Sequence, residues 1–192
     1  MSKPTFPPGG TFFDTVKKSY ADVSVGPDNA IPTSQFLEAS ESLLTLFDVL
    51  GSVAFNPVKG DMAGNIKKVR DREVAAPTES ASLQELVVNE IKGKKHTAAE
   101  AQALRHNLTN PDKELSVSFR EAYGGTLKPH HSFMIKPIFS AAMSATPYRK
   151  DFFAKLGDDQ SKVDAEMQKW LEALEEQVKI LKDFQATKPA KW

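Results

Sequence analysis

The chain contains no cysteine, and this absence removes several classes of chemistry at once. Disulfide bonds, thiol catalysis and zinc sites of the cysteine type are excluded, which suits a reducing compartment. An excess of one charge is also lacking, because 25 Lys and Arg residues balance 25 Asp and Glu residues. A net charge of zero supplies no overall field that attracts nucleic acid, so nucleic acid is not an expected partner.

Long apolar runs are lacking as well. The stretch "MSKPTFPPGG" at the amino terminus has no apolar signal core, and no later run reaches the length of a membrane span. The 192 residues, 40% of them apolar and 26% charged, have the size and composition of one ordinary domain. We therefore expect a single domain over residues 1–192 and a cytoplasmic location.

Catalytic motifs are the third absence. The sequence has no phosphate-binding glycine loop, no G-x-S-x-G elbow and no H-E-x-x-H pair. His130 and His131 could bind a metal, but adjacent helix positions point about 100° apart and no carboxylate stands at an obvious ligand spacing. Asp61 has no plausible sequence partner for acid/base work. We expect binding without catalysis, and neither a metal nor a cofactor.

What the sequence does contain is helical periodicity along most of its length, with no alternation that indicates strands. Gly51 is placed to end one helix, and Thr33 or Ser34 to begin it. Ser82 with Glu85, and Thr97 with Glu100, resemble capping boxes. The fold class predicted is all-α. The expected helices are 11–23, 35–51, 56–72, 83–93, 98–110, 114–123, 130–145 with a kink at Pro137, 148–157, and a last one through 163–181.

The helix expected from "VKGDMAGNIKKVRDR", residues 58–72, carries two stripes. At 100° per residue the first is the apolar set Val58, Met62, Ile66 and Val69. The second, about a quarter turn away, is Asp61, Asn65, Lys68 and Arg72. A carboxylate, an amide and an ammonium on the border of a buried face could converge on one polar ligand. The alternative is a solvated helix flank with pairing between successive turns.

Two longer stretches together resemble the glycolipid transfer protein family, most closely its fungal heterokaryon-incompatibility members. They are "FDVLGSVAFNPVKGDMAGNIKKV" and "LKPHHSFMIKPIFSAAMSATPYRKDFFAKLG", in that order. The family's D-x-x-x-N-x-x-K element corresponds to Asp61, Asn65 and Lys68, and its histidine to His131. The resemblance covers most of the chain. It implies a two-layer all-helical sandwich that carries one glycosphingolipid between membranes, with no cofactor and no covalent step.

The resemblance also implies roles for individual residues. Asp61 and Asn65 would bind the first sugar, with Asp61 also accepting from the ceramide amide, and Lys68 would bind further hydroxyls. His131 would donate to the ceramide carbonyl. Phe133 and Phe139 would line the apolar cavity for the lipid chains, although both could equally be ordinary core. That cavity is needed because each buried CH₂ is worth about 0.8 kcal/mol, which a lipid loses on leaving a bilayer.

Asn65 distinguishes two branches of this superfamily. The branch that carries ceramide phosphate has a lysine at this position and additional arginines for the phosphate. An amide at position 65 favours a neutral sugar headgroup, such as that of glucosyl- or galactosylceramide. The expected partners are therefore a neutral glycosphingolipid and, transiently, a membrane surface.

One segment departs from the family. Members have a tryptophan, within a pattern like W-L-x-R-G-L-x-F, whose indole stacks on the sugar. Here "HTAAEAQALRHNLTN" lacks it, and roughly three turns of helix are absent near residues 101–102. The two tryptophans present, Trp170 and Trp192, cannot be assigned this role. The departure leaves a second interpretation open, a lipid sensor or interaction protein on the same fold that does not transfer lipid.

The stretch "TFFDTVK" contains Phe12, Phe13 and Asp14. This sequence loosely resembles the motif of two phenylalanines and an acid that binds endoplasmic-reticulum tethering proteins. A tethering protein is therefore a further candidate partner. The simpler interpretation is an amphipathic first helix.

Overall fold

The computed structural model describes residues 6–93 and 112–187, and their regular structure is entirely helical. The α-helices are α1 (Thr33–Leu50), α2 (Asn56–Ala75), α3 (Leu83–Gly93), α5 (Leu115–Gly125), α6 (Ile135–Ser144), α7 (Arg149–Leu156) and α8 (Gln160–Gln185). Short 3-10 helices are η1 (Phe12–Thr15), η2 (Tyr20–Asp22), η3 (Val53–Phe55) and η4 (Pro77–Glu79). The all-α prediction is confirmed. No helix within the described ranges could span a membrane, since each is too short or too polar.

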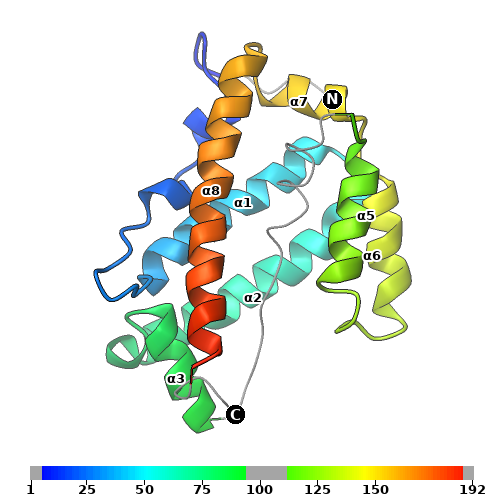
Figure 1. Ribbon diagram of the computed structural model, residues 1–192. Helices are drawn as coiled ribbons and strands as arrows, with labels where there is room; N and C mark the ends of the chain where they lie inside the picture. The colour runs from blue at the N-terminus through cyan, green and yellow to red at the C-terminus, as the bar shows by residue number, and fades with distance from the viewer. Residues whose placement is uncertain (1–5, 94–111, 188–192) are drawn as a thin grey trace.

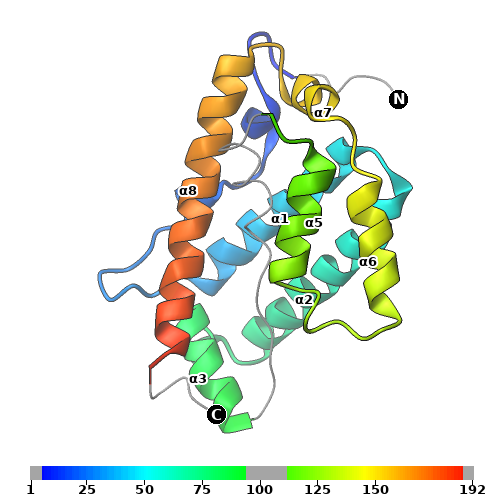
Figure 2. The ribbon, with the colours of Figure 1, turned by 45° about the vertical axis from the view of Figure 1, so that its right-hand side comes forward.

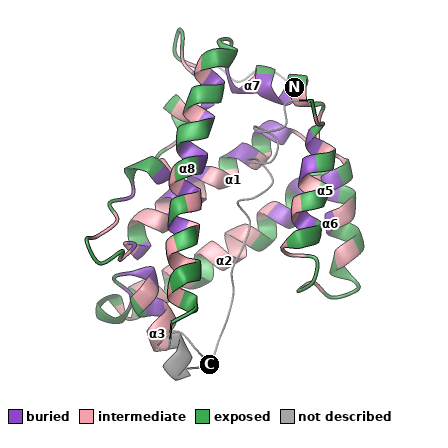
Figure 3. Cartoon of the chain, in the orientation of Figure 1, coloured by how far each residue is buried: buried purple, intermediate pink, exposed green. Residues whose placement is uncertain are grey.

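The helices form two layers. In Figures 1 and 2, α8 and α5 lie in front of α1 and α2, while α6 packs beside α5 and also contacts α2. The helix α7 contacts both α1 and α8 and so joins the layers at one end. Figure 3 shows that buried residues of α1, α5 and α8 fall mainly on the sides that face other helices. The predicted two-layer sandwich is therefore the observed architecture.

The centre of the core is the apolar face of α8. Asp159 begins this helix, because its side chain accepts a hydrogen bond from the backbone N–H of Lys162 at 3.1 Å. Its apolar residues recur every three or four positions, which places them on one face. They are all at most 5% exposed: Val163, Met167, Trp170, Leu171 and Leu174.

The first segment of the chain differs from the prediction. Instead of one helix over 11–23, it forms the separate turns η1 and η2. Each turn begins with its own capping box, Thr11 with Asp14 and Ser19 with Asp22. A capping box fixes the start of a helical turn, so two boxes eight residues apart divide the segment. Both turns pack on α8.

Two of the predicted helix ends are confirmed. Gly51 ends α1 in the left-handed conformation, with φ 74°. The Ser82 hydroxyl accepts from the Glu85 N–H, and the Glu85 carboxylate accepts from the Ser82 N–H, both at 3.1 Å. The predicted N-cap of α1, Thr33 or Ser34, is wrong: the helix begins at Thr33, Pro32 is its N-cap residue, and no side chain caps it.

Other predicted details are wrong in instructive ways. Helix α6 begins at Ile135, so Pro137 lies in its first turn and causes no kink there, since first-turn N–H groups need no helical partner. Helix α2 buries Val58, but Met62, Ile66 and Val69 are only half-buried. The capping box of Thr97 and Glu100, and the helix expected over 98–110, lie outside the described residues.

The positive φ of Gly51 generates a stability prediction. Gly51→Ala is expected to lower the free energy of unfolding by about 1 kcal/mol, because L-residues are strained in the left-handed region. Gly60→Ala is the matched control. Gly60 lies inside α2 with open space around its Cβ position, so alanine there should stabilise the protein by about 0.5–1 kcal/mol. Urea unfolding measures both, and equal effects of one sign would contradict the assignment of the helix end.

Candidate functional site

The second stripe predicted on the helix over 56–72, which we call the polar line, lies on α2. Asp61 is exposed, Asn65 is half-buried and Lys68 is exposed. The Lys68 ammonium donates to the Asn65 side-chain oxygen at 3.3 Å, one turn apart. Among the described residues, Asp61 makes no hydrogen bond or ion pair. Arg72, the fourth member, is paired with Glu79 at 2.7 Å, so the available donors and acceptors are those of the first three residues.

His131 lies in a second group of side chains, formed by α5 and α6. Its ring is half-buried in the connection between these helices, and its Nδ1 lies 3.2 Å from the Tyr123 hydroxyl. Phe139 meets the imidazole almost perpendicularly, with ring centroids 4.4 Å apart at 67°. Tyr123 stacks on Phe139 at 5.6 Å and 20°. Two buried aromatic rings therefore restrict the imidazole while leaving part of it exposed.

The two groups belong to elements that pack together. Helix α2, which carries the polar line, packs on α6, and α6 begins four residues after His131. Within the described part of the chain, no hydrogen bond joins His131 to Asp61, Asn65 or Lys68. The polar line therefore lies on a helix that packs against α6, and within the described residues it makes no hydrogen bond to the half-buried imidazole that precedes α6.

Tyr123 is a member of this site that sequence reasoning missed. It is only 6% exposed, and this burial raises the pKa of its phenol above the ordinary value. The only sequence signal was an aromatic residue on an expected helix eight residues before His131. That spacing alone does not predict a contact, because the intervening connection determines where the chain returns.

The two residues predicted to line a cavity for the lipid chains, Phe133 and Phe139, differ in burial. Phe139 is 4% exposed and lies inside the core. Phe133 is 83% exposed, in the turn before α6, so its ring lies on the surface and not in the interior. The helix expected over 130–145 begins only at Ile135, and on any continuous helix residues six apart would lie about 120° from each other, so the two rings do not share one face. A chain-lining role for either residue stays a prediction.

Trp170 cannot supply the missing sugar platform. Its side chain is 3% exposed and packs against Phe13 and Tyr20, with ring centroids 6.3 and 5.1 Å away. A stacking platform must present a face to its ligand, and both neighbours cover this indole. Trp192 lies outside the described residues.

The segment that resembles a tethering motif is docked on the domain. Phe12 is 5% exposed, and Lys162 of α8 pairs with Asp14 at 3.1 Å. The Thr11 backbone N–H, and then Lys162, hold the pKa of the Asp14 carboxyl below its usual value. A partner that binds all three motif residues must first detach η1 from α8.

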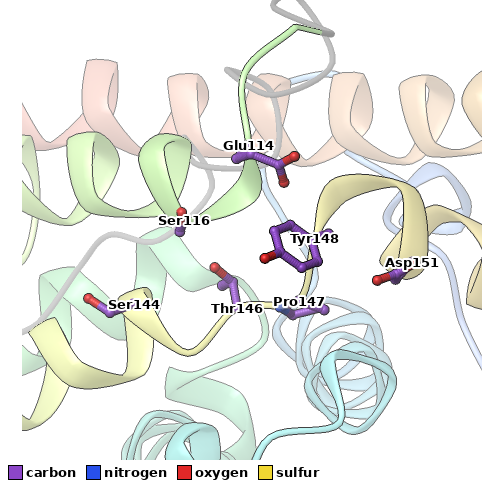
Figure 4. Close-up of a pocket in the computed structure, with 7 residues that line it drawn as sticks. All are labelled: Glu114, Ser116, Ser144, Thr146, Pro147, Tyr148 and Asp151. Carbon is purple, nitrogen blue, oxygen red and sulfur yellow. The ribbon is translucent and has the colours of Figure 1, made fainter.

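A surface pocket of about 370 Å³ lies where α5 and α7 begin and α6 ends (Figure 4). Its lining is mostly polar: Glu114, Ser116, Ser144, Thr146, Pro147, Tyr148 and Asp151. None of the predicted site residues lines it. In addition, no group of three or more His, Asp or Glu side chains suited to a metal occurs in residues 6–93 and 112–187.

A family model described as "Glycolipid transfer protein (GLTP)" matches residues 31–158, which include the polar line and His131. The chain belongs to the glycolipid transfer protein family. It is 66% identical to a protein of Aureobasidium melanogenum named "Glycolipid transfer protein", over 97% of this chain and 98% of that one. Their match spans 199 residues, more than the 192 of this chain, so the relative has residues without a counterpart here.

Solved structures of the same family agree with the fold. The fungal glycolipid transfer protein HET-C2 matches with a TM-score of 0.87 and 55% identity, over 95% of this chain and 100% of that chain. A structure described as showing how FAPP2 selects simple glycosphingolipids using the GLTP fold matches with a TM-score of 0.78 and 28% identity, over 95% and 98% of the two chains.

Relatives also occur as parts of larger proteins. The mouse pleckstrin homology domain-containing family A member 8 is 34% identical over 89% of this chain. The match spans 38% of that protein's length. The family domain therefore accounts for less than half of this relative.

Proposed function

We propose that this chain carries a neutral glycosphingolipid between membranes, holding its sugar and ceramide amide by hydrogen bonds and making no covalent bond to it. The observation that carries the proposal is the polar line on α2, where Asp61 has no partner among the described residues and Lys68 makes only a long bond to Asn65. The restrained imidazole of His131 accompanies it. Family membership and 66% identity to a named glycolipid transfer protein support it. We further propose that residues 1–192 act as one domain.

The polar line has the chemistry that a sugar requires. Sugar hydroxyls both donate and accept hydrogen bonds, so they need fixed groups of each kind. Asp61 accepts, Lys68 donates and Asn65 does both. Lys68 already reaches Asn65 at 3.3 Å, a long contact that a sugar hydroxyl can replace at little cost.

His131 and Phe139 are proposed to act at the ceramide. The imidazole would donate to the amide carbonyl of the lipid, while Asp61 accepts from the amide N–H. Phe139, which touches the imidazole from within the core, would mark where the lipid chains begin. The hydrogen bonds would select the lipid, and apolar burial would compensate for its removal from the bilayer.

A sugar is proposed in preference to a phosphate. A phosphate is matched best by guanidinium and ammonium groups, whereas position 65 carries an amide and Arg72 is already paired with Glu79. The relative whose description concerns simple glycosphingolipids is 28% identical, and a mouse ceramide-1-phosphate transfer protein shares the fold at 17%. The missing sugar platform is expected to weaken binding, not to change its specificity.

Membrane contact is proposed for an exposed apolar patch at the start of α6. It consists of Phe133, Met134, Ile135 and Ile138, which are 83, 69, 37 and 44% exposed. Exposed apolar groups clustered on one short segment are typical of a docking surface. Such contact would be peripheral. The cytoplasmic location and the tethering protein remain predictions.

The carrier proposal predicts that Asp61→Asn weakens glycolipid binding about tenfold or more, because a carboxylate acceptor is lost. The free energy of unfolding should change by less than about 0.5 kcal/mol, since Asp61 is exposed. Asp71→Asn is the matched control, an exposed carboxylate of α2 paired with Lys67 on another side of the helix. Titration with glucosylceramide in phosphatidylcholine vesicles measures the affinities. Equal losses of affinity in the two variants would contradict the proposal that the polar line binds the sugar.

The membrane patch generates a separate prediction. Phe133→Ala is expected to weaken partitioning to phosphatidylcholine vesicles about tenfold, because a phenylalanine side chain gains about 1.5–3 kcal/mol when buried. Val74→Ala provides the control, since Val74 is an exposed apolar residue of α2, 75% exposed, away from the patch. Cosedimentation with vesicles measures both. If Phe133→Ala partitions to vesicles as well as the wild-type chain does, the patch is not the membrane contact.

A further inference from the structure

The Tyr123 side chain is buried, and its hydroxyl lies within hydrogen-bonding distance of His131, a candidate ligand-binding residue. Tyr123 is 6% exposed, and its oxygen lies 3.2 Å from Nδ1 of His131. Its ring is also 5.7 Å from the imidazole, at 48°. Phe139 contacts both rings. The three side chains form one aromatic cluster, which we call the His131 cluster.

The direction of this hydrogen bond follows from counting protons. A buried phenol must donate its proton, because an unsatisfied donor costs free energy. Burial raises the pKa of Tyr123, so the phenol keeps that proton at neutral pH. Within the described residues, the acceptor found for it is Nδ1 of His131. Nδ1 therefore accepts and carries no proton.

The state of one ring nitrogen decides the state of the other. A neutral imidazole has one N–H, so a proton-free Nδ1 leaves the proton on Nε2. Phe139 packs on the ring at 4.4 Å and restricts its rotation. An imidazole in this state offers a single donor on the side away from Tyr123.

We propose that Tyr123 is a positioning residue that holds His131 as an Nε2–H donor for the amide carbonyl of the bound lipid. This inference rests on the proposed function and adds a requirement to it. The ligand must present a carbonyl acceptor at this point, so N-acylated glycolipids should be preferred to glycosylated bases without an acyl group. Tyr123 itself does not touch the ligand.

The first experiment examines the imidazole without any lipid. Histidine is labelled with ¹⁵N, and long-range ¹H–¹⁵N spectra distinguish protonated from unprotonated ring nitrogens; His131→Gln assigns the signals. We expect an unprotonated Nδ1 and a protonated Nε2 at neutral pH. Tyr123→Phe should shift the Nδ1 resonance while keeping the ring contacts. A protonated Nδ1 in the neutral wild-type ring would overturn the inference.

The second experiment measures affinity for glucosylceramide in phosphatidylcholine vesicles. Tyr123→Phe is expected to bind about fivefold more weakly, the loss typical of one hydrogen bond. In the His131→Ala background the same change should cause no further loss. Equal losses in both backgrounds would show that Tyr123 does not act through His131.

Tyr20→Phe is the matched control. Tyr20 is 2% exposed and donates to the Ser40 hydroxyl at 3.0 Å, so this variant loses a comparable buried bond outside the His131 cluster. Its affinity and the His131 spectrum should be unchanged. If the folded wild-type chain binds no glycolipid, the proposed function fails, and the spectrum still decides whether Tyr123 sets the state of His131.

Discussion

Five apolar side chains on one face of α8 are at most 5% exposed, and both ends of the described chain pack against this helix. Trp170, near the middle of this face, contacts Phe13 and Tyr20 and so fixes the first segment of the chain against the last helix. Because α8 also contacts α3 and α7, its apolar face connects elements from both ends of the sequence. The same packing explains why Trp170 is unavailable to a ligand.

With the core organised around α8, helix α2 is left with a lightly buried position. It buries Val58, while its polar line faces outward and keeps hydrogen-bonding groups free of strong internal partners. The imidazole of His131, by contrast, is held by buried neighbours on two sides. In the proposed function, the exposed polar flank would bind the sugar hydroxyls and the restrained imidazole would bind the amide of a glycolipid.

The sequence was sufficient for features that depend on local periodicity or caps. The all-α class, the helix end at Gly51 and the Ser82 capping box are of this kind, as is the common face of Asp61, Asn65 and Lys68. Features that depend on tertiary contacts were not predictable. One helix was expected over 11–23, but the structure forms two turns there, each with its own capping box and each packed on α8.

The same distinction applies to the site. Phe133 and Phe139 share an apolar stretch of sequence, yet Phe133 precedes α6 and lies on the surface, whereas Phe139 lies within α6 and in the core. Tyr123 was missed because its contact with His131 depends on the path of the α5–α6 connection. Sequence motifs therefore indicated the polar half of the candidate site, whereas the packing around His131 could be seen only in the structure.

The most direct measurement of the central claim is intermembrane transfer by the folded wild-type chain. Labelled glucosylceramide and labelled ceramide-1-phosphate are compared in the same donor and acceptor vesicles, with folding verified by circular dichroism. We predict transfer of glucosylceramide and little transfer of ceramide-1-phosphate. Preferential transfer of ceramide-1-phosphate would contradict the assignment of a sugar to the polar line, and no transfer of either lipid would contradict carriage itself.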